Sequence, residues 1–241
     1  MRKTLPLGIF ILALGFVGLG HLYADNAAIT EVFKSRGYDV KIISTQDSGL
    51  KDFEFVIVAQ ENFWIPFLAS QSKKVLIGVT PDTILSEDSG FSKHLTETIQ
   101  KVRDHNQTIT DNAVVAIFEK YKINVVHFAG KNAKSEYLVL DINCPHCQTE
   151  ITQNFAKRLK SGANVYVLVA GVLGMDSAKK AATFYQEIES KKSDKEKQDY
   201  INEVFSKGIK PKDNIDITRI MNITIELGAA GLRGVPYVIE R

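Results

Sequence analysis

The fold is decided by residues 137–147, which read Tyr137-Leu138-Val139-Leu140-Asp141-Ile142-Asn143-Cys144-Pro145-His146-Cys147. The stretch opens on a short apolar run of the kind that forms a strand in the middle of a sheet. Pro145 then suits the first turn of an α-helix, where its missing N–H is not needed. The sequence therefore predicts a strand over 137–141 that leads into a helix over 144–160, with two cysteines one turn apart at the helix start.

This placement favours a reactive thiol at residue 144. The free N–H groups and the positive dipole end of a helix stabilise an anion at its start, so Cys144 should ionise more easily than an ordinary thiol. The thiolate is the form that attacks disulfides. Cys147 would be more enclosed, and could attack a mixed disulfide at Cys144 to release the substrate. His146 would add an electropositive group that makes the disulfide more oxidising; the alternative is an exposed side chain without a role.

The cysteine count favours reversible chemistry over a structural bond. Cys144 and Cys147 are the only cysteines in the 241 residues. A bond between residues three apart removes little chain entropy from the unfolded state, so it stabilises poorly. Zinc is a weak alternative, because a structural site needs four ligands and the histidines at 94, 105 and 127 are scattered. We expect a redox-active disulfide with no metal and no other cofactor.

Charge and the N-terminus limit the partners and the compartment. The chain has 30 basic and 28 acidic side chains, a formal net charge of +2, which gives no footprint for nucleic acid. Residues 1–24 have a basic start, an apolar core and a possible cleavage point after Ala24, as a secretory signal peptide has. Leu22 stands where a small residue is usual, so an uncleaved anchor is the alternative. Both place the folded part outside the cytoplasm.

The rest of the chain suggests two folded regions joined by a helix. Residues 25–90 predict one helix over 27–36 and four strands, over 38–43, 53–59, 63–68 and 75–79. Trp64 is expected in the core, with a binding role as the alternative. Residues 91–109 predict a polar linker helix over 92–106, which bridges two domains or packs on one of them. Residues 110–241 predict an α/β domain, with strands over 123–128, 137–141, 165–170 and 237–239, and helices over 111–121, 144–160, 176–190, 194–205 and 213–227.

The chain resembles the bacterial Dsb thiol–disulfide oxidoreductases, which have the thioredoxin fold. The Cys144-Pro145-His146-Cys147 motif resembles that of the DsbA oxidases, whereas the small N-terminal region, the linker helix and the 173–178 segment resemble the DsbC/DsbG group. The resemblance implies an α+β N-terminal dimerisation domain, a linker helix and an α/β thioredoxin-like catalytic domain with a helical insertion. It also implies a V-shaped homodimer joined through the N-terminal domains. Members of the DsbC/DsbG group usually continue beyond the position of Arg241 and, in DsbC, carry a further cysteine pair.

By the same resemblance, the Val235-Pro236 bond is cis and lies against the cysteines, where the backbone before the proline can pair with an extended substrate. A turn before an edge strand is the plainer alternative for Pro236. Asp141 would aid proton transfer or make a strand-end contact. The leading hypothesis is a dimeric periplasmic oxidase that donates its disulfide to exported proteins with cysteines and uses a membrane redox partner of the DsbB or DsbD type. The alternatives are a disulfide isomerase or reductase, and a chaperone-like protein that binds unfolded chains.

Overall fold

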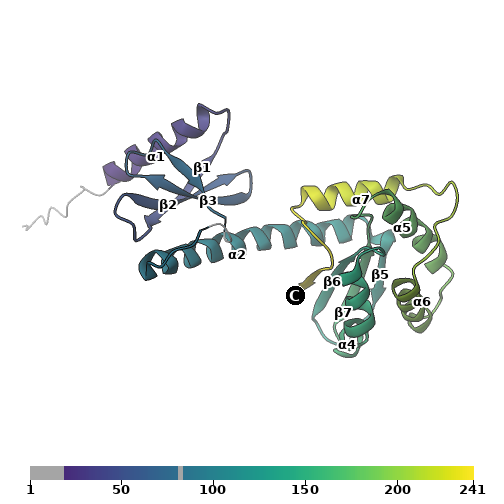
Figure 1. The fold of residues 1–241 in the computed structure, drawn as a ribbon. Coiled ribbons are helices and arrows are strands. Elements are labelled where there is room, and N and C mark those ends of the chain that lie inside the picture. The colour runs from purple at the N-terminus through teal and green to yellow at the C-terminus, as the bar shows by residue number, and fades with distance from the viewer. Residues whose placement is uncertain (1–18, 81–83) are drawn as a thin grey trace, which may run out of the picture. The chain divides into compact units, whose positions relative to one another are not determined.

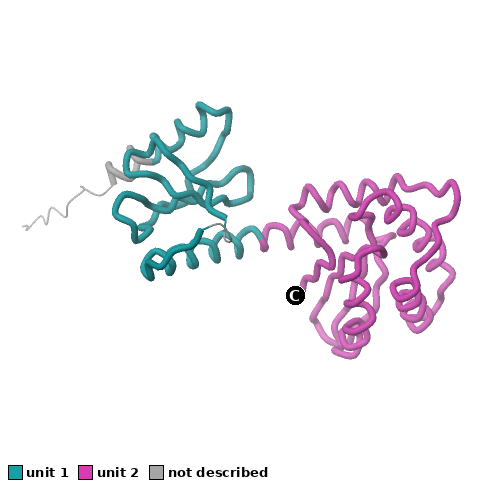
Figure 2. Tube along the Cα trace, in the orientation of Figure 1, with its two compact units in different colours: residues 1–106 teal, residues 107–241 magenta. Residues whose placement is uncertain are grey.

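The computed structural model describes residues 19–80 and 84–241. Residues 1–18 of the expected signal peptide lie outside the described part of the chain, and residues 19–24 form the start of a helix that continues to Lys34. The chain divides into two compact units, residues 1–106 and 107–241 (Figure 2). Among the described residues, no helix combines the length and the apolar character that crossing a bilayer requires.

The first unit is a four-stranded antiparallel sheet with a helix on each face (Figure 1). The strands are β1 (Lys41–Asp47), β2 (Phe53–Gln60), β3 (Phe63–Ser70) and β4 (Leu76–Gly78), in that order across the sheet. Successive residues of β2 point to opposite faces. Val56 and Val58 pack against Ile29 of helix α1 (Leu19–Lys34), while Phe55 packs with Phe91 of helix α2 (Ser89–Lys120). The expected small sheet with one helix is therefore present, with α2 on its second face.

Helix α2 differs from the prediction of two helices over 92–106 and 111–121. It runs unbroken for 32 residues from Ser89 to Lys120. The intervening residues 107–110 contain threonines but no glycine or proline, and threonine costs only a few tenths of a kcal/mol in a helix. The first part of α2 packs on the sheet of the first unit, and Val114, Ile117 and Phe118 belong to the core of the second.

Trp64 is half-buried rather than a core residue. Its ring stacks on the His105 ring with the centroids 3.8 Å apart. Its backbone N–H donates to Oδ1 of Asn106 at 2.8 Å, and its carbonyl accepts from Nδ2 of the same residue at 2.9 Å. The aromatic side chain thus fastens the start of β3 to α2.

The second unit is built on a mixed sheet in the order β5-β7-β6-β8. Its strands are β5 (Val125–Phe128), β6 (Ser135–Leu140), β7 (Asn164–Val169) and β8 (Tyr237–Glu240), and the short 3₁₀ helix η1 (Lys122–Asn124) precedes β5. Strands β6 and β7 are parallel, and the two outer strands run antiparallel to their neighbours. Residues Leu138, Val139 and Leu140 are completely buried, which confirms the central strand expected from the sequence. The unit has the thioredoxin-like α/β architecture that the resemblance implied.

Helices surround this sheet (Figure 1). The helix after the cysteines consists of α3 (Pro145–Thr149), a π-helical turn η2 (Glu150–Phe155) and α4 (Ala156–Lys160). The helical insertion comprises α5 (Met175–Ile188), α6 (Asp194–Lys207) and α7 (Thr218–Ala229). Helix α7 begins five residues later than the predicted 213–227, because Asn214 has a left-handed backbone (φ 55°) and the Asp216 carboxylate accepts the Thr218 N–H at 2.9 Å.

Candidate active site

The turn between β6 and α3 is organised by Asp141. This side chain is completely buried, and its two carboxylate oxygens accept the backbone N–H groups of Asn143 (2.8 Å) and Leu173 (2.9 Å). Its carbonyl accepts the N–H of Cys144 at 3.1 Å. These bonds favour the strand-end contact over a proton-transfer role, and they hold the backbone on both sides of Ile142.

Cys144 is the N-cap of α3, directly before Pro145. Its sulfur accepts the backbone N–H of Cys147 at 3.4 Å and donates to the carbonyl of Val235 at 3.2 Å. An N-cap side chain receives the free N–H groups of the first turn, which suits a negatively charged sulfur. The structure therefore places Cys144 at the helix start, where the sequence predicted it.

Cys147 lies one turn further and is completely buried. Its sulfur accepts the backbone N–H of Asp141 at 3.4 Å. Burial raises the pKa of the Cys147 thiol well above its usual range; the hydrogen bond and charge of Cys144 add to this, while the Asp141 N–H opposes it. Both cysteines are free in this structure. Because its pKa is raised, the Cys147 side chain is a neutral thiol, one helical turn from Cys144.

Val235 and Pro236 reach the site from the far end of the chain. The peptide bond between them is cis, as the resemblance implied. The Val235 carbonyl is the one that accepts from Cys144, 91 residues away in sequence. Both residues are half-buried, and β8 begins at Tyr237 immediately after them.

His146 and Pro145 are exposed on the outer side of the same turn. The imidazole makes no hydrogen bond to any other side chain or backbone group in residues 19–80 and 84–241. Its proposed influence on the Cys144 thiolate stays a prediction. Within the same described ranges, no cluster of three or more His, Cys, Asp and Glu side chains could hold a metal.

The sequence analysis missed the role of Asn143. Its amide nitrogen donates to Asp176 (2.8 Å) and to Ser177 (2.9 Å), and its amide oxygen accepts from Lys180 (2.8 Å). These three partners lie in the first turns of α5, within or just after the 173–178 segment that entered the resemblance. No local pattern marks an asparagine that bonds to residues 33 to 37 positions later.

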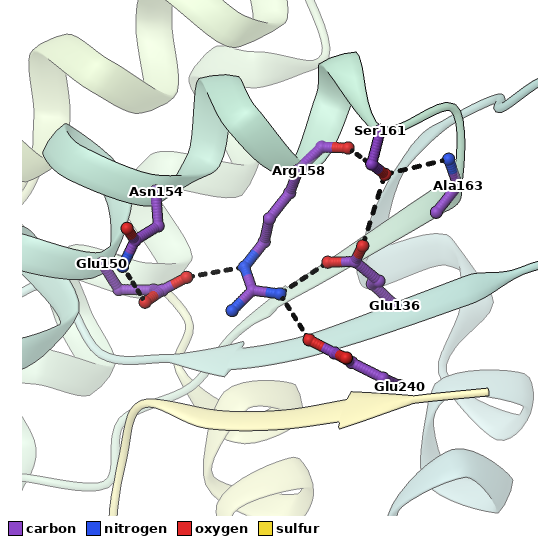
Figure 3. A network of polar contacts seen from close by, with 7 residues as sticks. All are labelled: Glu136, Glu150, Asn154, Arg158, Ser161, Ala163 and Glu240. Carbon is purple, nitrogen blue, oxygen red and sulfur yellow. Dashed lines mark hydrogen bonds and ion pairs between the residues drawn. The ribbon is translucent and has the colours of Figure 1, made fainter.

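A second unpredicted network holds the helix after the cysteines to the sheet (Figure 3). The guanidinium of Arg158 in α4 donates to Glu150 at the start of η2 (2.7 Å), to Glu136 in β6 (2.6 Å) and to Glu240 in β8 (3.1 Å). Glu150 also accepts from Asn154 at 2.8 Å. Burial lowers the pKa of Arg158, but the three carboxylates outweigh it and raise that pKa above its usual value.

Residues 29–115 match the family model described as "Disulfide isomerase DsbG N-terminal". DsbG of Helicobacter pylori is similar over 90% of this chain and 100% of its own, with 25% identity and a TM-score of 0.50. Two further solved structures are alpha-DsbA2 of Wolbachia pipientis (18% identity, TM-score 0.42, covering 54% of this chain and 86% of that one) and ScsC of Proteus mirabilis (13%, 0.40, 62% and 79%). No curated protein matches the chain in sequence.

The family model and the Helicobacter structure support a thiol–disulfide oxidoreductase of the Dsb type. The family model covers residues 29–115, which are most of the first unit and the first residues of the second. The similarity to the Helicobacter structure extends to the unit that carries Cys144 and Cys147. The residues that match the family model and the residues of the candidate site thus lie in different parts of the chain.

Proposed function

We propose that this protein is a periplasmic thiol–disulfide oxidoreductase that donates the Cys144–Cys147 disulfide to exported proteins. The observation that carries the proposal is the pair of unequal cysteines: Cys144, which is 5% exposed, caps a helix against the Val235 carbonyl, and Cys147 is completely buried one turn further. One sulfur is placed for attack by a substrate thiolate, and the other is placed to leave.

The reaction is a two-step exchange. A substrate thiolate attacks the Cys144 sulfur, and the electron pair of the S–S bond leaves on Cys147, which takes up a proton. The raised pKa of the Cys147 thiol supports that uptake. A second substrate thiolate then attacks the substrate sulfur of the mixed disulfide, and Cys144 leaves as a thiolate that takes up the second proton. The substrate has lost two electrons and two protons, and the protein is left as the dithiol.

A substrate must lie against the site in an extended form for this exchange. Val235 and Pro236 border Cys144, and the backbone of residue 235 would pair with the substrate strand next to its cysteine. Pro145 and His146 are exposed on the other side of the sulfur and would contact the same segment.

A contact of Cys144 favours the oxidising direction. The Cys144 sulfur accepts the Cys147 N–H at the helix start, and contacts that stabilise the reduced form make a disulfide more oxidising. Reoxidation would then come from a membrane disulfide donor of the DsbB type. A homodimer formed through the first unit is part of the proposal, and sedimentation of the chain from residue 25 should give twice the monomer mass.

The second candidate is a disulfide isomerase or reductase, kept reduced by a membrane partner of the DsbD type. The match of residues 29–115 to the DsbG isomerase model favours it. Rapid thiol alkylation in cells distinguishes the two directions, since an oxidase should be found mainly as the disulfide and an isomerase as the dithiol.

The exchange itself is tested with a peptide whose cysteine is held in a disulfide with glutathione, so that attack by a protein thiolate forms a mixed disulfide and releases glutathione as the thiol. Cys147→Ser should accumulate a mixed disulfide through Cys144, because the resolving thiol is missing, and mass spectrometry should locate it. Cys144→Ser is the matched control and should form none. A mixed disulfide that forms equally well on Cys144→Ser would contradict the assignment of the attacked sulfur.

A further inference from the structure

The amide of Asn143 is fixed by charged and buried partners on both of its ends. Its two N–H groups go to the carboxylate of Asp176 and the hydroxyl of Ser177, and its oxygen faces the ammonium of Lys180. An amide has two donors on nitrogen and an acceptor oxygen. A flipped amide would set its oxygen against the carboxylate and its N–H groups against the cation, so only one orientation satisfies this site.

Two partners of Asn143 also bond to each other, and the third is buried. Asp176 and Lys180 form an ion pair at 2.8 Å across one turn of α5, and Ser177 is 1% exposed. The hydrogen bonds of Lys180 and then Asn143 hold the pKa of the Asp176 carboxyl below its usual value. The carboxylate is therefore charged and available to accept from Asn143 at neutral pH.

A separate set of contacts ties the same part of α5 to the active-site turn. The Leu173 N–H donates to the Asp141 carboxylate at 2.9 Å, two residues ahead of α5. A side-chain carbon at Gly171 would lie 2.7 Å from the Cα and Cβ atoms of Ala178. No side chain therefore fits between the segment that follows β7 and helix α5 at this point. The turn is thus joined to the start of α5 at Asp141 and at Asn143, on both sides of Ile142.

We propose that Asn143 is a positioning residue that holds Cys144 in the geometry of the dithiol and so makes the disulfide more oxidising. The proposal rests on the proposed exchange at Cys144 and Cys147. In the dithiol, the Cys144 sulfur donates to Val235 and accepts from Cys147 N–H. In the disulfide, the S–H is gone, and the sulfur lies about 2.05 Å from its partner sulfur.

The direction of the effect follows from this difference. Formation of the disulfide removes two protons and two electrons and pulls the Cys144 sulfur toward Cys147. The Cys144 sulfur can then no longer donate to the Val235 carbonyl. A group that holds the backbone of residues 143 and 144 in the position needed for that hydrogen bond therefore stabilises the dithiol. Removing the Asn143 amide should shift the equilibrium toward the disulfide and make the protein a weaker oxidant.

The test is the equilibrium of the protein with reduced and oxidised glutathione, read by acid trapping and chromatography of the two forms. One net hydrogen bond corresponds to a factor of about three to ten in an equilibrium constant. We expect Asn143→Ala to shift the constant toward the disulfide by about three- to tenfold, or about 15–30 mV more negative in potential. Ser177→Ala should shift the equilibrium constant in the same direction. The double variant should shift it by less than the sum of the two single changes in free energy, because both variants remove the same hydrogen bond.

Ser193→Ala is the matched control. Ser193 caps α6 with its side chain in a complete capping box, so the variant also loses a side-chain hydrogen bond at a helix start in the same unit. It should lower the urea midpoint, because a helix cap is lost. Its equilibrium constant with glutathione should stay within about twofold of the wild-type value, since the cap stabilises both redox forms.

Three results decide the proposal. If Asn143→Ala destabilises dithiol and disulfide equally, with an unchanged constant, Asn143 is structural only and the proposal is overturned. If the wild-type protein forms no Cys144–Cys147 disulfide in any glutathione buffer, the proposed function itself fails. Should Asn143→Ala not fold, Lys180→Gln removes the cation at the amide oxygen together with its ion pair to Asp176, and an unchanged constant in that variant overturns the proposal as well.

Discussion

Replacing Arg158 by methionine should destabilise the protein strongly at neutral pH. The guanidinium bonds to Glu136 and Glu150, whose side chains are 13% and 11% exposed, while its own side chain is 18% exposed. Its third partner, Glu240, is 71% exposed, and exposed pairs contribute little. Methionine keeps much of the side-chain volume, so the change mainly removes the charge between two enclosed carboxylates.

The size of the effect follows from the two enclosed pairs. Removing one partner of a buried ion pair costs about 3–5 kcal/mol, because the remaining charge is left uncompensated. All three side chains keep some exposure, so we expect a loss of about 3 kcal/mol in the free energy of unfolding at pH 7.

Urea denaturation of both proteins at pH 7 measures this. Lys195→Met is the control, because the Lys195–Asp199 pair lies on the surface with 75% and 58% exposure, and its loss should change the free energy of unfolding by less than about 0.5 kcal/mol. A loss below about 1 kcal/mol for Arg158→Met at pH 7 would refute the electrostatic argument.

Three further changes test the site itself. His146→Ala should make the Cys144–Cys147 potential more negative in glutathione buffers, because it removes an electropositive group beside the thiolate; an unchanged potential would mean that His146 is a bystander. In the reduced protein, iodoacetamide at pH 8 should modify Cys144 first and Cys147 only in urea, since burial raises the pKa of the Cys147 thiol, and mass spectrometry of peptides would detect the reverse order. Gly171→Ala should lower the urea midpoint and shift the glutathione equilibrium as Asn143→Ala does, because the added carbon pushes the start of α5 away from the end of β7. A lower urea midpoint with an unchanged glutathione equilibrium would mean that this contact affects stability and not the redox potential.

The parts of the molecule that depend on local pattern were predictable. The buried strand before Cys144 and the helix start at Pro145 follow from residues next to one another, and both are present. The continuity of α2 was missed because packing on two cores overrides weak local preferences at residues 107–110. The partners of Asn143 and Arg158 were missed for a different reason: each bond joins residues brought together by the sheet topology, and no spacing rule links them.

The conflict between an isomerase-like architecture and an oxidase-like motif has a physical resolution. Redox direction depends on the free-energy difference between dithiol and disulfide, which is set by a few contacts around Cys144, such as those of Val235, Cys147 and the neighbouring Asn143. The DsbG-like first unit is held by its own two apolar clusters, neither of which includes a residue of the cysteine-containing unit. The groups that touch the sulfurs therefore bear directly on the potential of Cys144 and Cys147, and the direction of exchange is argued from them as well as from the match of the first unit.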